Sequence, residues 1–403
     1  MKKNKTFDYT QLMAHTIKIY KFLGFWRPDP DMKHKNLYHC YTAFWLSLSL
    51  IFISSQVIYM YNSRKSLKEV LAALYITLTF VSILARQLTT YQSMNELKEI
   101  IKDLNRPLFQ VKCQKHYEIA DKTTRNQRLL YNICLFLGLS TDIFAAIFPL
   151  LANEKVILAK AWFPYDWTKP FNYFMTYIFQ NAVLIWHTLV CYSGDMSTFT
   201  LLLHIGIQCD ILCYTLNHLD DFYFKDGMLH EITPRDKLEF RKDMEKFSQA
   251  MAKNLVVCVR HHREIIKFAK DIQRIKEVDI FILFASRALI LCTCLFQLSM
   301  VQFGSVESMM LLFFSMCMLT EQFVFCWFGS DIIYKGSLIL QAAYNTPWTD
   351  CNNRFRKILL QFMTQACCPL NIPVGGLFVM SLPIFISVLQ TAYSFLTLLH
   401  SIQ

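Results

Sequence analysis

Residues 37–60 read LYHCYTAFWLSLSLIFISSQVIYM, without a single Asp, Glu, Lys or Arg. An α-helix needs about 20 mostly apolar residues to cross the roughly 30 Å hydrocarbon layer of a membrane, and this stretch meets that length. Comparable apolar runs recur along the chain at 69–90, 129–151, 172–200, 278–302, 307–329 and 376–400. The sequence therefore predicts an all-α membrane protein with seven transmembrane helices.

The composition agrees with a membrane-embedded chain. Apolar residues make up 54% of the 403 residues and charged residues only 18%, which is unusually apolar for a soluble protein of this length. The first 36 residues show no apolar stretch followed by a small-residue cleavage site. We therefore expect no cleaved signal peptide, so that the first span is its own insertion signal.

Lys and Arg are divided unequally between the two sides of the predicted bundle. With the N-terminus inside, only six of the 41 Lys and Arg residues fall in the outer connections, and two more, Arg86 and Arg287, lie within spans. Because positive residues favour the cytoplasmic side, we expect a cytoplasmic N-terminus and an extracellular C-terminus. The net charge of +11 then reflects topology and does not indicate a nucleic-acid partner.

The cysteines fit the same orientation. None of the fourteen lies in the predicted outer connections at 61–68, 152–171 and 303–306. No disulfide framework is therefore expected on the oxidising side of the membrane.

The connections on the cytoplasmic side have a helical pattern. Apolar residues recur near helical spacing among charges at 236–275 and at 351–367, which predicts long extensions of spans four and five and a short helix before the last span. Pro369 and Pro373 then break the chain. We divide the chain into three parts: a cytosolic N-terminal segment, 1–36; spans one to six with their cytosolic extensions, 37–350; and the short cytosolic helix with the seventh span, 351–403.

No motif in the sequence indicates an enzyme or a cofactor. The phosphate-binding, dinucleotide, metalloprotease and nucleophile-elbow patterns are all missing from the sequence. The adjacent pair His261-His262 favours a packing or surface role over metal binding, because neighbouring helical residues point about 100° apart. We expect no catalytic residue and no metal site.

Charges inside the predicted spans are informative, because an unpaired ion in hydrocarbon costs several kcal/mol. Arg287 in span five and Glu321 in span six favour a structural ion pair, with an ion-pathway role as the alternative. Asp142 in span three has no obvious partner. One interpretation is that it faces a water-filled cavity.

The last span carries a stripe of small polar residues on one helical face. They are spaced by three or four residues: Ser387, Gln390, Thr391, Ser394, Thr397 and Ser401. Such a stripe either joins helices or lines a narrow aqueous path, and the residues alone leave both interpretations open. Leu398 and Ile402 interrupt the stripe near its outer end, where apolar side chains can close a pore by dewetting.

Several short segments resemble one family. YNTPW at 344–348, RKILL at 356–360, SLPIF at 381–385 and YSFLTLL at 393–399 are similar to the C-terminal signature of insect odorant receptors. The segments YKFLGFWRP at 20–28 and CVRHH at 258–262 extend the resemblance, which covers the whole chain.

The resemblance implies a subunit of an odour-gated, non-selective cation channel in the plasma membrane of olfactory neuron dendrites. It implies a heterotetramer with the family's co-receptor, a cytosolic helical anchor region and a pore lined by the last helix. The outside of this tetramer would contact membrane lipid. The pore and gate residues would be Ser387, Thr391, Ser394, Leu398, Ser401 and Ile402. The co-receptor has an extended loop between spans four and five that this chain lacks, so the chain resembles a ligand-tuning subunit.

The resemblance also places an odour site in the outer halves of spans two to six. The residues expected there are Tyr75, Thr79, Ile143, Phe144, Ile147, Phe148, Phe174, Tyr177, Met309 and Phe313. An aromatic and Met-rich pocket suits a small volatile molecule, because it offers apolar surface with few polar anchors.

Three other classes of seven-span or multi-span protein fit less well. A G-protein-coupled receptor needs the opposite orientation, and a transporter would show internal repeats. A gustatory receptor of the same superfamily would share topology and pore, and it is the nearest alternative. Its usual ending, a Thr-Tyr pair followed by Gln-Phe, differs from that of this chain.

Overall fold

The computed structural model describes residues 7–28, 34–151, 156–225, 228–232, 244–302 and 304–402. Its α-helices are α1 (Gln11–Phe22), α2 (Lys35–Asn62), α3 (Leu67–Gln92), α4 (Met94–Asp103), α5 (Gln114–Leu151), α6 (Pro170–Asn217), α8 (Met244–Met300), α9 (Val306–Tyr344), α10 (Asn353–Ala366) and α11 (Leu382–Ile402). Short 3-10 helices occur at Pro107–Phe109, Leu219–Asp221 and Trp348–Asp350.

Each of the seven predicted apolar runs lies wholly or mainly in a helix, and the run at 376–400 begins before α11, in the segment that contains β4 (Phe378–Val379). Six of these helices, α2, α3, α5, α6, α8 and α9, are long and apolar enough to cross a membrane. In α11, which has 21 residues, the apolar segment found among the described residues is the shorter stretch Leu382–Ser394. The predominantly helical architecture with six long apolar helices is therefore confirmed, while the number of spans and the seventh span stay predictions.

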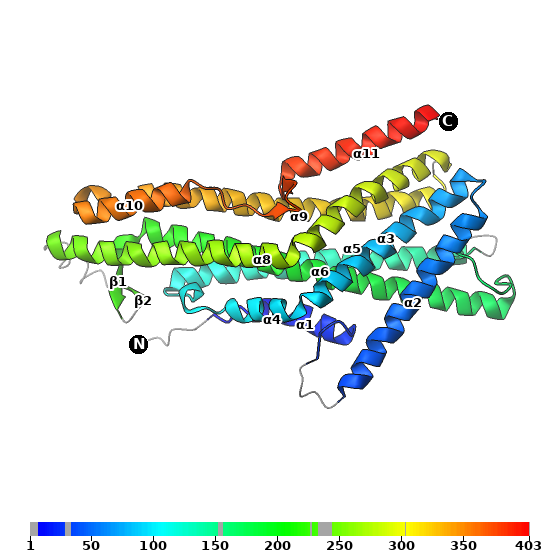
Figure 1. Ribbon diagram of the computed structural model, residues 1–403, viewed down its shortest axis with the longest axis horizontal. Helices are drawn as coiled ribbons and strands as arrows, with labels where there is room; N and C mark the ends of the chain where they lie inside the picture. Colours follow the sequence, from blue (N-terminus) through cyan, green and yellow to red (C-terminus); the bar gives the residue numbers. More distant parts are fainter. Residues whose placement is uncertain are drawn as a thin grey trace.

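The long helices lie side by side along the longest axis of the molecule (Figure 1). One end carries α10 and the β1–β2 hairpin, and the other end carries the turns that join α2 to α3 and α8 to α9. Helix α11 leaves the bundle at an angle and ends at the C-terminus (Figure 1). The bundle extends well past α11 because α6, α8 and α9 have 48, 57 and 39 residues.

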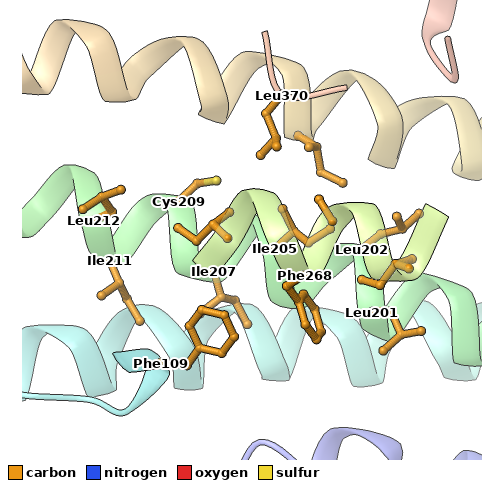
Figure 2. Close-up of a cluster of buried hydrophobic side chains, with 14 of the residues drawn as sticks. Phe109, Leu201, Leu202, Ile205, Ile207, Cys209, Ile211, Leu212, Phe268 and Leu370 are labelled. Carbon is orange, nitrogen blue, oxygen red and sulfur yellow. The ribbon is translucent and has the colours of Figure 1, made fainter. Parts of the chain in front are cut away.

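Helix α6 is the central element of the bundle. Of the residues in the most apolar 18-residue stretch of α6, 78% are buried, whereas in the corresponding stretch of α2 only 22% are buried. A helix that is apolar on all sides is either enclosed by other helices or faces lipid. Helix α6 fits the first case and α2 the second. Figure 2 shows the main core, in which Leu202 and Ile205 of α6 lie near Phe268 of α8 and Leu370 of the segment after α10.

The start of α11 is fixed on the middle of α9. A Cβ atom at Gly329 would collide with the backbone oxygen of Met380, so only glycine allows this approach. The hydroxyl of Ser330 accepts a 2.9 Å hydrogen bond from the backbone nitrogen of Leu382. Just before this contact the chain turns through Gly375 and Gly376, whose φ angles of +58° and +66° are those that glycine adopts at little cost.

The structure departs from the all-α prediction at two short antiparallel hairpins. Strand β1 (Phe222–Lys225) pairs with β2 (Met228–Glu231), and β3 (Pro373–Val374) pairs with β4 (Phe378–Val379). Two-residue and four-residue strands leave too little periodic pattern to be recognised in a sequence. The fold is therefore predominantly helical and not strictly all-α.

The expected cytoplasmic helices are present as helices. The predicted helix at 351–367 is α10, whose Asn352 side chain accepts a 3.0 Å hydrogen bond from the Phe355 nitrogen and caps its start. The predicted run at 236–275 falls in α8 from Met244 onward, and residues 233–243 lie outside the described residues. Helices α1 and α4 were not expected, and both bury apolar side chains in the core.

Candidate ligand cavity, charge network and polar stripe

A cavity of about 160 Å³ lies among α3, α5, α6 and α9, with Phe52 of α2 also in its wall. Aromatic and aliphatic side chains such as Phe80, Phe199 and Phe314 make up most of the wall. Cavities of this kind, apolar with a few polar groups, are typical of sites for small molecules.

The connection between α5 and α6 closes one part of the cavity wall through Leu158 and Ala159. The buried Gln180 side chain of α6 holds this connection with two hydrogen bonds to Ala159. Its amide nitrogen donates to the Ala159 oxygen over 2.8 Å, and its oxygen accepts from the Ala159 nitrogen over 3.3 Å. One amide side chain therefore fixes a backbone segment that has no regular secondary structure of its own.

Asp142 and His187 are the most informative polar groups of the wall. Asp142 of α5 is only 5% exposed, and one carboxyl oxygen accepts a 3.0 Å hydrogen bond from the Thr188 hydroxyl of α6. The interpretation that Asp142 faces a cavity fits this position, while Thr188 is a partner that the sequence did not reveal. His187 is 1% exposed, and its Nε2 lies 2.9 Å from the Ser49 hydroxyl oxygen of α2.

A network of buried charges adjoins the cavity and contributes Asp195 and Glu321 to its wall. Arg86 of α3 donates to Asp195 of α6 over 2.5 Å and to Asp279 of α8 over 2.7 Å. Lys276 adds a cation 3.4 Å from Asp279. The three helices are thereby joined by charge-assisted hydrogen bonds, which are stronger than neutral ones.

Arg287 of α8 forms an ion pair with Glu321 of α9, as predicted from their isolated charges. Counting the whole network, three cations (Arg86, Lys276, Arg287) face three carboxylates (Asp195, Asp279, Glu321), so the formal charges balance. The balance matters because a buried charge without a partner is strongly destabilising.

Cys191, Asp195 and Glu321 place their sulfur and carboxylate atoms within 4.8 Å of one another, a separation that suits a metal ion. Both carboxylates are already paired with guanidinium groups. A metal ion would have to displace Arg86 and Arg287 from the carboxylates. The arrangement therefore fits a structural ion-pair network better than a metal site.

The structure divides the residues expected to bind a ligand. Tyr75 and Thr79 lie in the cavity wall. Phe144 and Tyr177 are half-buried outside it; the Phe144 ring lies 6.2 Å from that of Phe313, and the Tyr177 hydroxyl donates to the Ala146 oxygen over 2.8 Å. The others of known exposure lie on the outer surface: Ile143, Ile147, Phe174, Met309 and Phe313. The side chain of Phe148 lies outside the described residues. That any of these ten residues binds a ligand stays a prediction.

On two helices the cavity faces the positions next to those expected. Asp142 and Ala145 of α5 line it instead of Ile143 and Phe144, and Met310 and Phe314 of α9 line it instead of Met309 and Phe313. The stripe of small and polar residues on α5 at Gly138, Thr141, Asp142 and Ala145 is the sequence signal that could have identified the cavity side.

The polar stripe of α11 faces away from the rest of the chain. Ser387, Gln390, Thr391, Ser394 and Thr397 are exposed, whereas Ala392 on the opposite side is buried and α11 packs on α8 and α9. The Thr391 and Ser394 hydroxyls donate to backbone oxygens one turn earlier, over 2.8 and 2.9 Å. Their oxygen lone pairs therefore point outward. The side chains of Leu398, Ser401 and Ile402 lie outside the described residues.

The adjacent histidines of α8 have packing roles. His261 lies 2.9 Å from the Gln208 amide oxygen, and the His262 ring packs edge-on against Phe362 of α10. Burial lowers the pKa of His262 to about 4, so its ring is neutral at physiological pH. The predicted preference for packing over metal binding agrees with these contacts.

Comparison with known proteins gives one consistent result. A family model described as 7tm odorant receptor matches residues 66–393. Odorant receptor Or1 of Anopheles gambiae is 22% identical over 399 residues, which cover 95% of this chain and 93% of the relative. Odorant receptor 94a of Drosophila melanogaster is 28% identical over 242 residues, 58% of each chain.

Two solved structures share the fold. The olfactory receptor OR5 of Machilis hrabei superposes with a TM-score of 0.78 at 17% identity, covering 98% of this chain and 100% of that one. The same receptor in complex with eugenol gives a TM-score of 0.78 at 15% identity and the same coverage. At these identities the likeness establishes the fold alone.

Proposed function

The chain belongs to the 7tm odorant receptor family, a family of membrane receptors and not of enzymes, and on this premise we propose that it is a ligand-tuning subunit of an odour-gated, non-selective cation channel. The cavity is the observation that carries the proposal. It is a largely apolar space lined mainly by four helices, and its size suits a small volatile molecule.

The proposed ligand site consists of the cavity wall and includes Tyr75 and Thr79 from the residues expected first. Phe80, Phe314 and Met310 add aromatic and thioether surface, which adapts to ligands of different shape. A ligand there would touch α3, α5, α6 and α9 together. Binding would favour whichever relative arrangement of these helices fits the ligand better.

The proposed pore is lined by α11. An exposed stripe of hydroxyl and amide groups is unfavourable against lipid, which offers no hydrogen-bond partners. Packing of several subunits around a common axis would place Ser387, Thr391 and Ser394 along a water-filled path, and their outward lone pairs suit a cation. Leu398 and Ile402, with Ser401 beside them, are the proposed gate.

The proposed assembly is a heterotetramer with the co-receptor in the plasma membrane of sensory dendrites, with the N-terminus inside and the C-terminus outside. The position of Lys and Arg supports this orientation. In Figure 1 the end with α10 would be cytoplasmic and would form the anchor region, while the end with the α2–α3 turn would be extracellular.

Co-expression in oocytes with the co-receptor, followed by recording of current during a broad panel of volatiles, tests the proposal. We expect some volatiles to evoke an inward cation current only when both subunits are present. Labelling of both subunits at the cell surface controls for expression. If both subunits reach the surface and no volatile evokes current, the proposed function is wrong.

A further inference from the structure

The free carboxyl oxygen of Asp142 is the feature of the cavity that most restricts its ligand. Oδ1 accepts the hydrogen bond from Thr188, while Oδ2 is buried and has no hydrogen-bond partner among the described residues. Asp142 lines the cavity, and no cation lies in an ion pair with it in the described part of the chain. A buried acceptor left without a donor is rare in proteins and usually has a reason.

His187 presents a second acceptor. The Ser49 hydroxyl donates its proton to the Trp45 oxygen over 2.8 Å, so it accepts from His187 Nε2–H. In a neutral imidazole the other nitrogen, Nδ1, is then the acceptor. It is buried and also has no partner among the described residues. Of the described residues that line the cavity, only Asp142 and His187 carry such an unpartnered buried side-chain atom.

Three threonines in the wall have also used their protons. The hydroxyls of Thr79, Thr141 and Thr320 each donate to the backbone oxygen four residues earlier over 2.8 Å. What they present to the cavity is oxygen lone pairs. Together with Asp142 and His187, these threonines give the wall five side chains that present acceptors.

We propose that the cavity selects small apolar molecules that carry a hydrogen-bond donor, an amine or a hydroxyl group, and that the donor binds Oδ2 of Asp142. This inference rests on the proposed function and names the ligand class of the same cavity. A closed apolar cavity of about 150 Å³ holds benzene, so the cavity of about 160 Å³ fits a six-membered ring with one substituent.

The test uses four ligands built on one cyclohexane ring, in oocytes that express this subunit and the co-receptor. Cyclohexylamine and cyclohexanol carry a donor, whereas cyclohexanone and methylcyclohexane carry none. We expect the amine or the alcohol to activate at concentrations about ten-fold or more below those of the two donor-free ligands, because a site with a buried unpaired acceptor rejects them. This ranking in the unmodified receptor needs no variant.

Variants at Asp142 assign the preference to its carboxyl group. Asp142→Leu should abolish the preference for donors, and Asp142→Asn should turn an N–H toward the cavity and improve the response to cyclohexanone. Asp121→Asn, on the same helix but in a surface pair with Arg125, is the matched control and should leave the ranking unchanged. Surface labelling identifies any variant that fails to fold.

The outcomes separate this inference from the proposed function. Equal or stronger activation by cyclohexanone or methylcyclohexane, with current present, overturns the inference and leaves the channel function intact; a preference for cyclohexanone alone would mean a protonated Asp142 that donates. A donor preference that survives Asp142→Leu also overturns it. Absence of current with every volatile of the broad panel, with both subunits at the surface, rejects the proposed function itself.

Discussion

Replacing Arg86 with leucine should destabilise the bundle more than any surface charge substitution. The Arg86 side chain is 6% exposed, and its guanidinium group donates hydrogen bonds to the carboxylates of Asp195 and Asp279, which belong to different helices. In Arg86→Leu both carboxylates lose their main partner. Removing one member of a buried ion pair costs about 3–5 kcal/mol, a large part of a typical folding free energy of about 5–15 kcal/mol.

The measurement is the apparent melting temperature of the protein in detergent, read from the loss of the monodisperse peak in size-exclusion chromatography after heating. We expect a decrease on the order of 5 °C for Arg86→Leu. The matched control is Arg125→Leu, which removes a pair whose Arg side chain is 72% exposed. Exposed pairs contribute about 0–1 kcal/mol, so this variant should melt close to the unmodified protein.

A double variant distinguishes loss of pairing from loss of packing. Replacing Arg86 and Asp195 together with leucine leaves Asp279 paired with Lys276 and Glu321 paired with Arg287, so no charge is left without a partner, and this variant should recover part of the lost stability. If Arg86→Leu melts at the same temperature as Arg125→Leu, the ion pairs do not join α3, α6 and α8 in the way described. If the double variant is less stable than Arg86→Leu, the cost comes from packing.

Four further outcomes are expected. Tyr75→Ala or Phe314→Ala in the cavity wall should change the order in which volatiles activate, whereas Phe174→Ala, 56% exposed and outside the wall, should not; identical response spectra for all three would refute the cavity as ligand site. Leu398→Ser or Ile402→Ser should raise resting current or alter permeability ratios, because a polar group wets a narrow apolar passage. Thr391→Val should change conduction without changing odour preference. Unaltered conduction in surface-expressed variants would return the stripe to a helix-packing role. An epitope tag at the N-terminus should be stained only in permeabilised cells and a tag after Gln403 in intact cells, and the reverse staining would contradict the orientation. Burial lowers the pKa of His116 from 6.5 to about 3, so below pH 6.5 the unfolded state gains a proton at this residue while the folded state stays neutral. The contribution of His116 to the free energy of unfolding should be full above pH 6.5 and should fall by about 1.4 kcal/mol per pH unit below it. Melting curves of His116→Gln should therefore show a weaker dependence on pH between 6.5 and 5.

The sequence predicted the long apolar helices well, because length and apolarity decide them. The run at 37–60 became α2, and the run at 278–302 became the C-terminal part of α8, with ends displaced by a few residues. The pair Arg287–Glu321 could also be predicted, since each charge is isolated in an apolar run and the two spans are joined by a short turn.

The partners of Arg86 could not be predicted, because they lie on two helices far away in the sequence. Asp195 and Asp279 are more than a hundred residues from Arg86 and are brought to it only by the packing of α6 and α8 against α3. Pairing across three helices needs their relative rotation, which local periodicity does not contain.

The side of a helix that faces the cavity was equally hard to predict. Residues 309–314 of α9 are all apolar, so this run gives no preferred direction, and the cavity lies beside Met310 and Phe314. On α5 the polar Asp142 did mark the correct side. Chemistry that is costly in lipid identifies a functional face more reliably than aromatic content does.

The contact at Gly329 connects ligand choice with silence at rest. Glu321, in the cavity wall, precedes Gly329 by eight positions in α9, a rise of about 12 Å along a continuous helix. Because no side chain stands between Gly329 and Met380, a rotation or shift of α9 moves the start of α11 directly. In the proposed channel, a substitution that enlarges the cavity for a bulkier odour also changes the resting position of the pore helix. New tuning would therefore often arise together with spontaneous activity, which later substitutions near Met380 would have to suppress.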